Sequence, residues 1–187
     1  MPRITVQEPS GREEIIRELQ SVQSQGRDFW NSFSTAEFFS PFGDAWSPAD
    51  NVRHLLKSTR PVAGALAMPK ALLAIRFGAA LRDSVTYSQL RERYQSILAT
   101  GFKAGRFTPA PLKPSEISEE HRRSMMASLD TTFENLLSAA ARWREWQLDR
   151  LRLPHPALGH LTVREMLFFT IYHHVHHVEN VVRRMAA

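Results

Sequence analysis

Apolar residues recur at every third or fourth position along four long segments of the chain, which is the spacing of one buried face of an α-helix. Strand signals, by contrast, are weak throughout. The pattern predicts four long helices, over residues 11–33, from 47 onward, from 118 to about 147, and from 162 to about 185. Four such helices with long, irregular connections predict an all-α fold, a four-helix bundle.

Three of the predicted helices begin with residues that cap helix N-termini. The segments Ser10–Glu13 and Thr162–Glu165 both have the form of a capping box, in which a hydroxyl and a carboxylate satisfy the first free amides. Ser47 can cap the second helix, and Pro48 suits the first helical position.

The connections are less regular than the helices. Residues 70–81 and 87–102 each have helical periodicity, and we expect short helices inserted between the second and third bundle helices. Residues 103–115 contain three prolines and predict a loop or lid. The connector at 153–160 contains two prolines and a glycine, so we expect it to be a loop as well.

The composition limits the class of protein. With 187 residues, 43% of them hydrophobic, we expect residues 1–187 to form one domain with a sizeable core. The absence of cysteine excludes disulfides, thiolate ligands, a cysteine nucleophile and iron–sulfur clusters. Because the sequence shows neither a signal segment nor an apolar run of about 18 residues, we expect a cytoplasmic protein that does not span a membrane.

The net charge of +5 raises the question of nucleic-acid binding. The arginines are scattered among acidic residues, and no nucleic-acid-binding motif is present. A solvated surface is therefore the preferred interpretation, and we expect no nucleic-acid partner.

Four of the eight histidines lie within residues 172–177, on the fourth predicted helix. His173 and His177 are four residues apart, so they lie on one face and could present two imidazoles to a single metal ion. A third ligand must come from another part of the fold, and His54 on the second helix is the candidate. His54 lies at the edge of the apolar stripe of its helix, where we expect a boundary residue with some exposure. His173 and His177 have the equivalent position on the fourth helix. The alternative is that these histidines only form hydrogen bonds in the core.

The remaining histidines have weaker signals. His176 falls among polar residues of the fourth helix, whereas His174 falls among apolar ones. His155 and His160 lie in the connector, and either could reach a site at the start of the fourth helix. That helix also has an apolar arc too wide for one partner layer. Either the inserted segment or a second subunit must cover it, and we expect a homodimer.

Two groups of residues resemble the DinB/YfiT-like family. One is Trp46-Ser47-Pro48 followed by Val52-Arg53-His54-Leu55. The other is His155-Pro156-Ala157-Leu158-Gly159-His160-Leu161-Thr162, leading to His173-x-x-His176-His177.

The resemblance implies a four-helix bundle that binds one divalent metal ion, zinc or nickel, through His54, His173 and His177. The family is often dimeric, and it includes metal-dependent transferases that join low-molecular-weight thiols to electrophiles. One departure is Asn180, where family members commonly carry glutamine three residues after the last histidine.

A metal with three protein ligands keeps positions open for water or substrate. There a thiol would become a thiolate nucleophile, and water would become a hydroxide for hydrolysis. No glutamate lies between His173 and His177, where an H-E-x-x-H metalloprotease carries its base. We therefore expect transfer of a small-molecule thiol to an electrophile held by residues 103–115, Asn51 and Ser58. A metal-dependent hydrolase and a non-catalytic metal-binding dimer are the alternatives.

Overall fold

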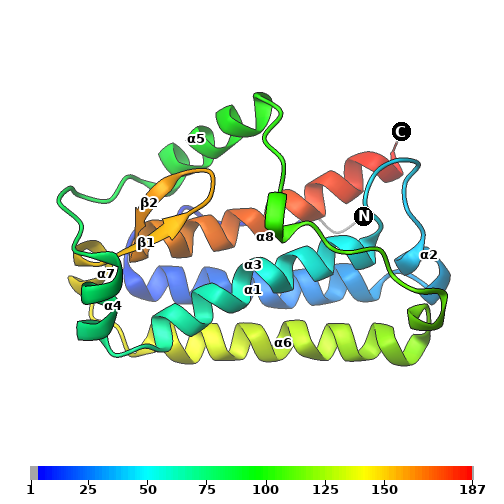
Figure 1. The fold of residues 1–187 in the computed structure, drawn as a ribbon, viewed down its shortest axis with the longest axis horizontal. Helices are drawn as coiled ribbons and strands as arrows, with labels where there is room; N and C mark the ends of the chain where they lie inside the picture. The colour runs from blue at the N-terminus through cyan, green and yellow to red at the C-terminus, as the bar shows by residue number, and fades with distance from the viewer. Residues whose placement is uncertain (1–3, 187) are drawn as a thin grey trace.

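Four long helices run lengthwise through the molecule (Figure 1). The structure is a computed structural model that describes residues 4–186. The long helices are α1 (Arg12–Asn31), α3 (Pro48–Ala67), α6 (Glu119–Ala141) and α8 (Val163–Met185). Helix α3 packs mainly against α6, and α1 packs against both α6 and α8. The predicted four-helix bundle is confirmed.

The capping residues explain where the helices begin. Ser47 and Thr162 cap α3 and α8 as predicted, with reciprocal bonds to the side chains of Asp50 and Glu165. The predicted capping box at Ser10–Glu13 is wrong by one residue. Gly11 is the N-cap of α1, and the Glu14 carboxylate accepts hydrogen bonds from the amides at positions 10 and 11.

The third long helix is shorter than predicted. Helix α6 ends at Ala141, and a separate short helix, α7 (Gln147–Arg150), follows it. Trp143 continues the apolar spacing of α6, but it lies in the turn. Its ring is buried there, and its Nε1–H donates to the carbonyl of Leu66 at 3.0 Å. Burial of this one side chain makes the helical pattern extend past the end of the helix.

The predicted inserted helices are present as α4 (Lys70–Phe77) and α5 (Tyr87–Ala99). Helix α5 lies apart from the four long helices, on the side of α8 (Figure 1). The Pro-rich loop contains two short 3-10 turns, η1 (Gly105–Phe107) and η2 (Pro114–Glu116), and the first turn contacts α3. A further helix that the sequence did not predict, α2 (Thr35–Phe39), lies in the first connection.

The connector before α8 is a β-hairpin, so its prediction as a loop is wrong. Strand β1 (Arg152–His155) pairs antiparallel with β2 (Gly159–Thr162). Leu153 and Leu161 face each other and are buried, while Pro154 and His160 on the other face are exposed. Gly159 has a φ of +75°, a backbone conformation that favours glycine at the turn. One buried apolar pair on strands of four residues is too short a pattern to read as period-two alternation.

Helix α8 is covered on nearly all sides, and every residue from 163 to 175 is buried. It contacts α1, α3, α5, α7 and both strands of the hairpin. The inserted α5 and the hairpin therefore cover the wide apolar arc within one chain. The width of this arc no longer argues for a second subunit, and the homodimer stays a prediction.

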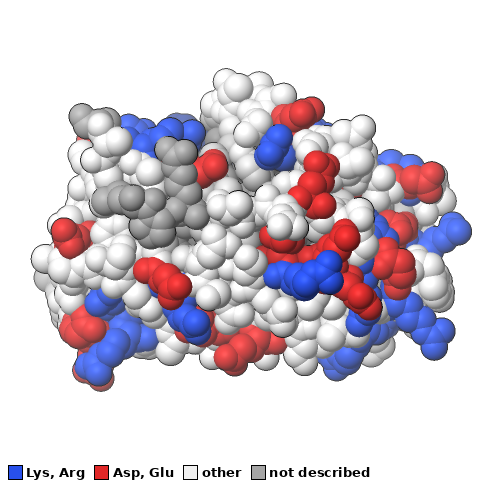
Figure 2. Space-filling model, turned by 180° about the vertical axis from the view of Figure 1, so that it is seen from behind, with Lys and Arg blue, Asp and Glu red and all other residues white. Residues whose placement is uncertain are grey.

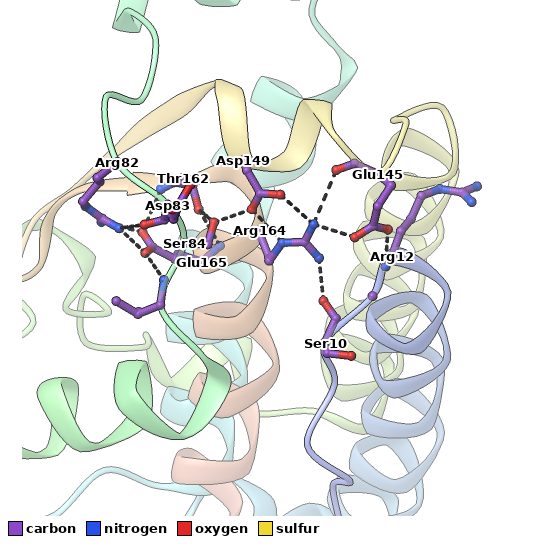
Figure 3. Close-up of polar contacts among 12 residues, drawn as sticks. Ser10, Arg12, Arg82, Asp83, Ser84, Glu145, Asp149, Thr162, Arg164 and Glu165 are labelled. Carbon is purple, nitrogen blue, oxygen red and sulfur yellow. Dashed lines mark hydrogen bonds and ion pairs between the residues drawn. The ribbon is translucent and has the colours of Figure 1, made fainter.

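A polar network holds the 78–86 segment and α7 against the start of α8 (Figure 3). The Glu165 carboxylate is fully buried, and it pairs with the guanidinium of Arg82 and accepts from the backbone amides of Val85 and Thr162 at 2.8 and 2.9 Å. Its neighbour Arg164 donates to Asp149 at 2.7 and 2.8 Å and also pairs with Glu145. Glu165 therefore has a structural role, since it holds the 78–86 segment to the start of α8.

Acidic and basic side chains lie close together on the face of the molecule seen in Figure 2. Among residues 4–186, no helix is both long and apolar enough to cross a membrane.

Candidate metal centre

Two of the bundle helices bring His54, His173 and His177 together. The Nε2 atom of His173, on α8, lies 3.1 Å from the Nε2 atoms of both His54, on α3, and His177, one turn further along α8. The three ligand atoms all lie within 4.8 Å of one another, and all three side chains are buried. The structure thus places at one point the three residues that the sequence named as metal ligands.

The other ring nitrogen of each histidine faces a hydrogen-bond acceptor. Nδ1 of His54 lies 3.0 Å from the carbonyl oxygen of Phe107, and Nδ1 of His177 lies 2.7 Å from Oδ1 of Asn51. The Asn51 amide is oriented by its Nδ2, which donates to the Ser47 carbonyl at 2.9 Å. Nδ1 of His173 has a longer contact, 3.4 Å, with the hydroxyl of Ser58.

These contacts place the imidazole protons on Nδ1 and leave each Nε2 as a bare acceptor. Burial lowers the pKa of His54 and lowers those of His173 and His177 much further, with repulsion among the neighbouring imidazoles acting in the same direction. All three rings are therefore neutral at neutral pH. Three lone pairs then face one another with no donor between them.

A divalent cation fits this arrangement. Metal–nitrogen distances of about 2.0–2.1 Å place two imidazole nitrogens about 3.3 Å apart in a tetrahedral site and about 3.0 Å apart in an octahedral one. Two of the three observed separations are 3.1 Å and lie between these values. Each ring also has the Nδ1 contact that orients metal-ligating histidines in proteins. The three histidines could therefore hold a metal ion, although their spacing does not identify it.

The prediction that His54 is a boundary residue with some exposure is wrong, since this residue is only 5% exposed. The helical pattern of α3 reflects its packing in the bundle, but the cover over His54 comes from elsewhere. The η1 turn supplies the Phe107 carbonyl, and the half-buried Trp46 ring lies with its centroid 5.0 Å from that of His54. Trp46 also stacks at 6.1 Å on the ring of His177.

A cavity of about 570 Å³ opens from the three histidines. Its walls come from α3, α5, the η1 turn, the hairpin and α8, and they are mainly aliphatic and aromatic. Arg106 is the single Lys or Arg among the described lining residues, and no Asp or Glu lines the cavity in this part of the chain. The predicted lid at 103–115 contributes Ala104, Arg106 and Phe107 to the wall.

Two of the polar residues predicted to hold substrate have other contacts. Ser58 lines the cavity but donates to the carbonyls of its own helix, and its oxygen faces His173. Asn51 is absent from the described cavity wall and orients His177 instead. That role could have been found in the sequence, because position 51 lies one turn before His54, on the same face of α3.

The four other histidines of α8 and the hairpin fall into three classes. His174 is buried in the core, with Nε2 3.1 Å from the Thr59 hydroxyl. His160 is exposed on β2. His155 and His176 both line the cavity. Asn180, which stands where family members commonly carry glutamine, contacts His176 and not the three proposed ligands. Its Nδ2 donates to Nε2 of His176 at 2.8 Å.

Comparison with known proteins agrees with this geometry. The family model of the DinB superfamily matches residues 18–181, a span that includes all three histidines of the centre. The chain belongs to the DinB superfamily. It is also similar to a crystal structure described as TT2238, a four-helix bundle protein, with a TM-score of 0.57 and 17% identity over 92% of this chain and 98% of that one. At 17% identity, this likeness is evidence of a shared fold only. No curated protein matches the chain.

Proposed function

We propose that this DinB superfamily protein binds one divalent metal ion, zinc or nickel, and joins a low-molecular-weight thiol to an electrophilic substrate. The observation that carries the proposal is the position of three neutral imidazoles at the end of an apolar cavity. When bound there, a divalent cation would keep open positions and favour the thiolate form of a thiol at neutral pH.

The cavity wall favours thiol transfer over hydrolysis. Hydrolysis requires a group that takes a proton from water, and no carboxylate lines the described cavity. The two further histidines in the wall have their acceptor nitrogens occupied. Nε2 of His176 accepts from Asn180, and Nδ1 of His155 accepts from the backbone amides of Ala157 and Leu158. A thiol needs less help, because it loses its proton far more readily than water does.

The surrounding residues also suit an electrophile with apolar parts. Aromatic and aliphatic side chains such as Tyr94, Phe169 and Met166 exclude water from the reacting atoms and bury the acceptor. Arg106, at the rim of the wall, is placed to pair with a carboxylate carried by either substrate. The absence of cysteine supports our expectation that the reaction takes place in the cytoplasm.

Metal binding is tested on protein purified without a histidine tag. We expect about one divalent ion per chain, and a sharp loss of metal when His54, His173 or His177 is replaced by alanine. His176→Ala is the matched control, because this residue lies beside His177 but turns its Nε2 to Asn180, and it should retain the metal. Equal loss in all four variants would overturn the assignment.

The activity is tested by turnover with a panel of thiols and electrophiles. In the cobalt-substituted protein, addition of the correct thiol should also produce a sulfur-to-metal charge-transfer band, which His177→Ala abolishes. If thiols leave the spectrum unchanged while an ester or amide is hydrolysed with the metal present, the protein is a hydrolase. If neither reaction occurs in the metal-loaded protein, it is a non-catalytic binding protein.

A further inference from the structure

The hairpin that precedes α8 places one more histidine in the cavity. His155 is the last residue of β1, and its ring lies 4.1 Å, centroid to centroid, from the ring of Phe169. Phe169 also stacks on the ring of His173 of the candidate metal centre, at 4.9 Å. Tyr94 contacts all three rings, so His155 and His173 share two aromatic neighbours, and both line the same cavity.

The backbone of the hairpin turn determines which nitrogen of His155 carries the proton. The amides of Ala157 and Leu158 both point to Nδ1, at 3.2 and 3.0 Å. A backbone amide can only donate, so Nδ1 must be the acceptor, and in a neutral imidazole the proton is then on Nε2. Burial lowers the pKa of His155 to about 4, so the ring is neutral at neutral pH.

The Nε2–H group of His155 is free to bind a ligand. Within residues 4–186, this atom has no hydrogen-bond acceptor. It is also not one of the polar atoms that are both buried and without a partner, so it is accessible to a ligand. The ring is only half-buried and lines the cavity. A histidine with a purely structural role in the turn would need only its Nδ1, so the donor on the other side of the ring is left for a molecule in the cavity.

We propose that Nε2–H of His155 donates a hydrogen bond to the oxygen of a conjugated carbonyl compound, and so defines the electrophile class. This inference rests on the proposed function. The thiolate sulfur forms a bond to the β-carbon of the acceptor. The π pair of the carbon–carbon double bond then forms a double bond between the α-carbon and the carbonyl carbon, the π pair of the carbonyl moves to its oxygen, and an enolate results. The proton released by the thiol returns to the α-carbon, so the product is the saturated thioether and nothing leaves.

A neutral imidazole suits this role. It donates to an oxygen that becomes negative in the transition state without giving up its proton, as a donor of an oxyanion hole does. The cavity is apolar around the donor, which strengthens the contact relative to water. His155 would then contact the substrate directly, from the hairpin that forms part of the cavity wall.

Two variants separate the donor from the structural contact. In His155→Asn, the side-chain oxygen can take the place of Nδ1 and accept from the amides of Ala157 and Leu158, but the donor in the cavity is lost. In His155→Gln, the longer amide reaches toward the position of Nε2 and can restore a donor. His160→Asn is the matched control, because His160 is an exposed histidine on the same hairpin.

The first measurement needs no turnover. Imidazole ¹⁵N chemical shifts should show the His155 proton on Nε2. The saturated ketone 4-phenylbutan-2-one, labelled with ¹³C at its carbonyl, should bind with its C=O stretch shifted to lower frequency in the wild type and in His160→Asn. The shift should be absent in His155→Asn. A proton on Nδ1, or the same carbonyl frequency in wild type and His155→Asn, overturns the proposal.

The second measurement compares two electrophiles, with 2-mercaptoethanol as the thiol. For 4-phenylbut-3-en-2-one, His155→Asn should lower kcat/KM by about a hundredfold to a thousandfold, the range for removal of one donor to a developing oxyanion. The variant His155→Gln should recover part of the loss. Benzyl chloride has no oxygen, so its kcat/KM should be unchanged.

The two proposals fail in different ways. Equal slowing of both electrophiles would mean that His155 is only structural, whereas thiol transfer itself would stand. A carbonyl shift that depends on His155, found without any thiol transfer, would keep the donor and refute the transferase.

Discussion

Replacing Asn51 by alanine should weaken metal binding although Asn51 is not a proposed ligand. Its Oδ1 accepts from Nδ1 of His177 at 2.7 Å, and the side chain is only 4% exposed. Loss of such an orienting partner typically costs about 10- to 100-fold in metal affinity. At about 1.4 kcal/mol per tenfold, this corresponds to about 1.4–2.8 kcal/mol of binding free energy.

The same substitution should also destabilise the metal-free protein. In Asn51→Ala, the Nδ1–H group of His177 loses its acceptor, and the Ser47 carbonyl loses the donor that reaches it at 2.9 Å. A buried polar group without a partner costs about 1–3 kcal/mol. Thermal unfolding with and without metal separates this effect from the change in affinity.

The assay is a competition titration of tag-free protein against a chromophoric chelator. Asn180→Ala is the matched control, since it removes an amide of the same kind that is bonded to His176 and not to a proposed ligand. Asn51→Asp keeps an acceptor for His177 and should bind metal within about tenfold of the wild type.

Two results would refute the reasoning. Asn51→Ala could bind metal as tightly as the wild type, in which case the amide does not support His177. Alternatively, Asn180→Ala could lose as much affinity, and then the amide three residues after the last histidine would act on the centre, contrary to its bond to His176.

Four further predictions concern stability and assembly. Arg82→Met should cost about 1–3 kcal/mol of unfolding free energy, because the half-exposed Arg82 pairs with the buried Glu165 carboxylate, which would keep only its two backbone-amide donors. Glu165→Gln should cost less, and urea unfolding of both variants tests the order. Burial would raise the pKa of Glu165, but the bonds from Arg82 and two backbone amides outweigh burial and lower it. The stabilisation by the ionised Glu165 should therefore be complete above the ordinary carboxyl pKa and disappear as the pH falls through the lowered value. Urea unfolding measured from pH 7 to pH 3 checks this dependence. Removing metal with a chelator should lower the melting temperature, because ligand at about 100 times its Kd contributes about 2.7 kcal/mol, and an unchanged Tm would argue against a bound ion. Light scattering after size exclusion should give the mass of a homodimer, as the family resemblance implies, and a monomer mass would contradict it.

The sequence predicts those parts of the site that depend on one helix. A separation of four residues was enough to place His173 and His177 on one face of α8, because helical geometry is local. The burial of His54 could not be predicted in this way. It depends on the η1 turn, which reaches His54 across 53 positions of the chain, and on Trp46 before α3. The periodicity of a helix records which face is apolar, but not which loop covers a polar residue at its edge.

The hairpin shows a different limit. Its alternating pattern consists of one buried pair, Leu153 and Leu161, and the prolines on either side of His155 favour a loop. The strands form where α4, α7 and α8 pack against the hairpin, which is a tertiary effect that propensity does not contain. The hydrogen bonds that fix the proton of His155 exist only in this turn.

Different parts of the fold supply the proposed metal ligands and much of the cavity wall. The three proposed ligands stand on α3 and α8, two long helices whose positions the bundle core fixes. Part of the cavity wall comes from α5, the η1 turn and the hairpin, which lie outside the four long helices, and α3 and α8 supply much of the rest. Substitutions in these connections can therefore change the shape of the cavity without moving the imidazoles.

Phe107 is the exception, because the inserted loop and the metal centre meet at its carbonyl, which accepts from Nδ1 of His54 at 3.0 Å. The bond from the Lys57 ammonium to the Thr108 carbonyl at 2.9 Å holds the next residue of the loop against the same helix. The acceptor at Nδ1 controls how strongly the opposite nitrogen donates to a metal. A displacement of this turn would alter the cavity wall and the basicity of one ligand together, so substrate fit and metal chemistry are coupled at this point of the molecule.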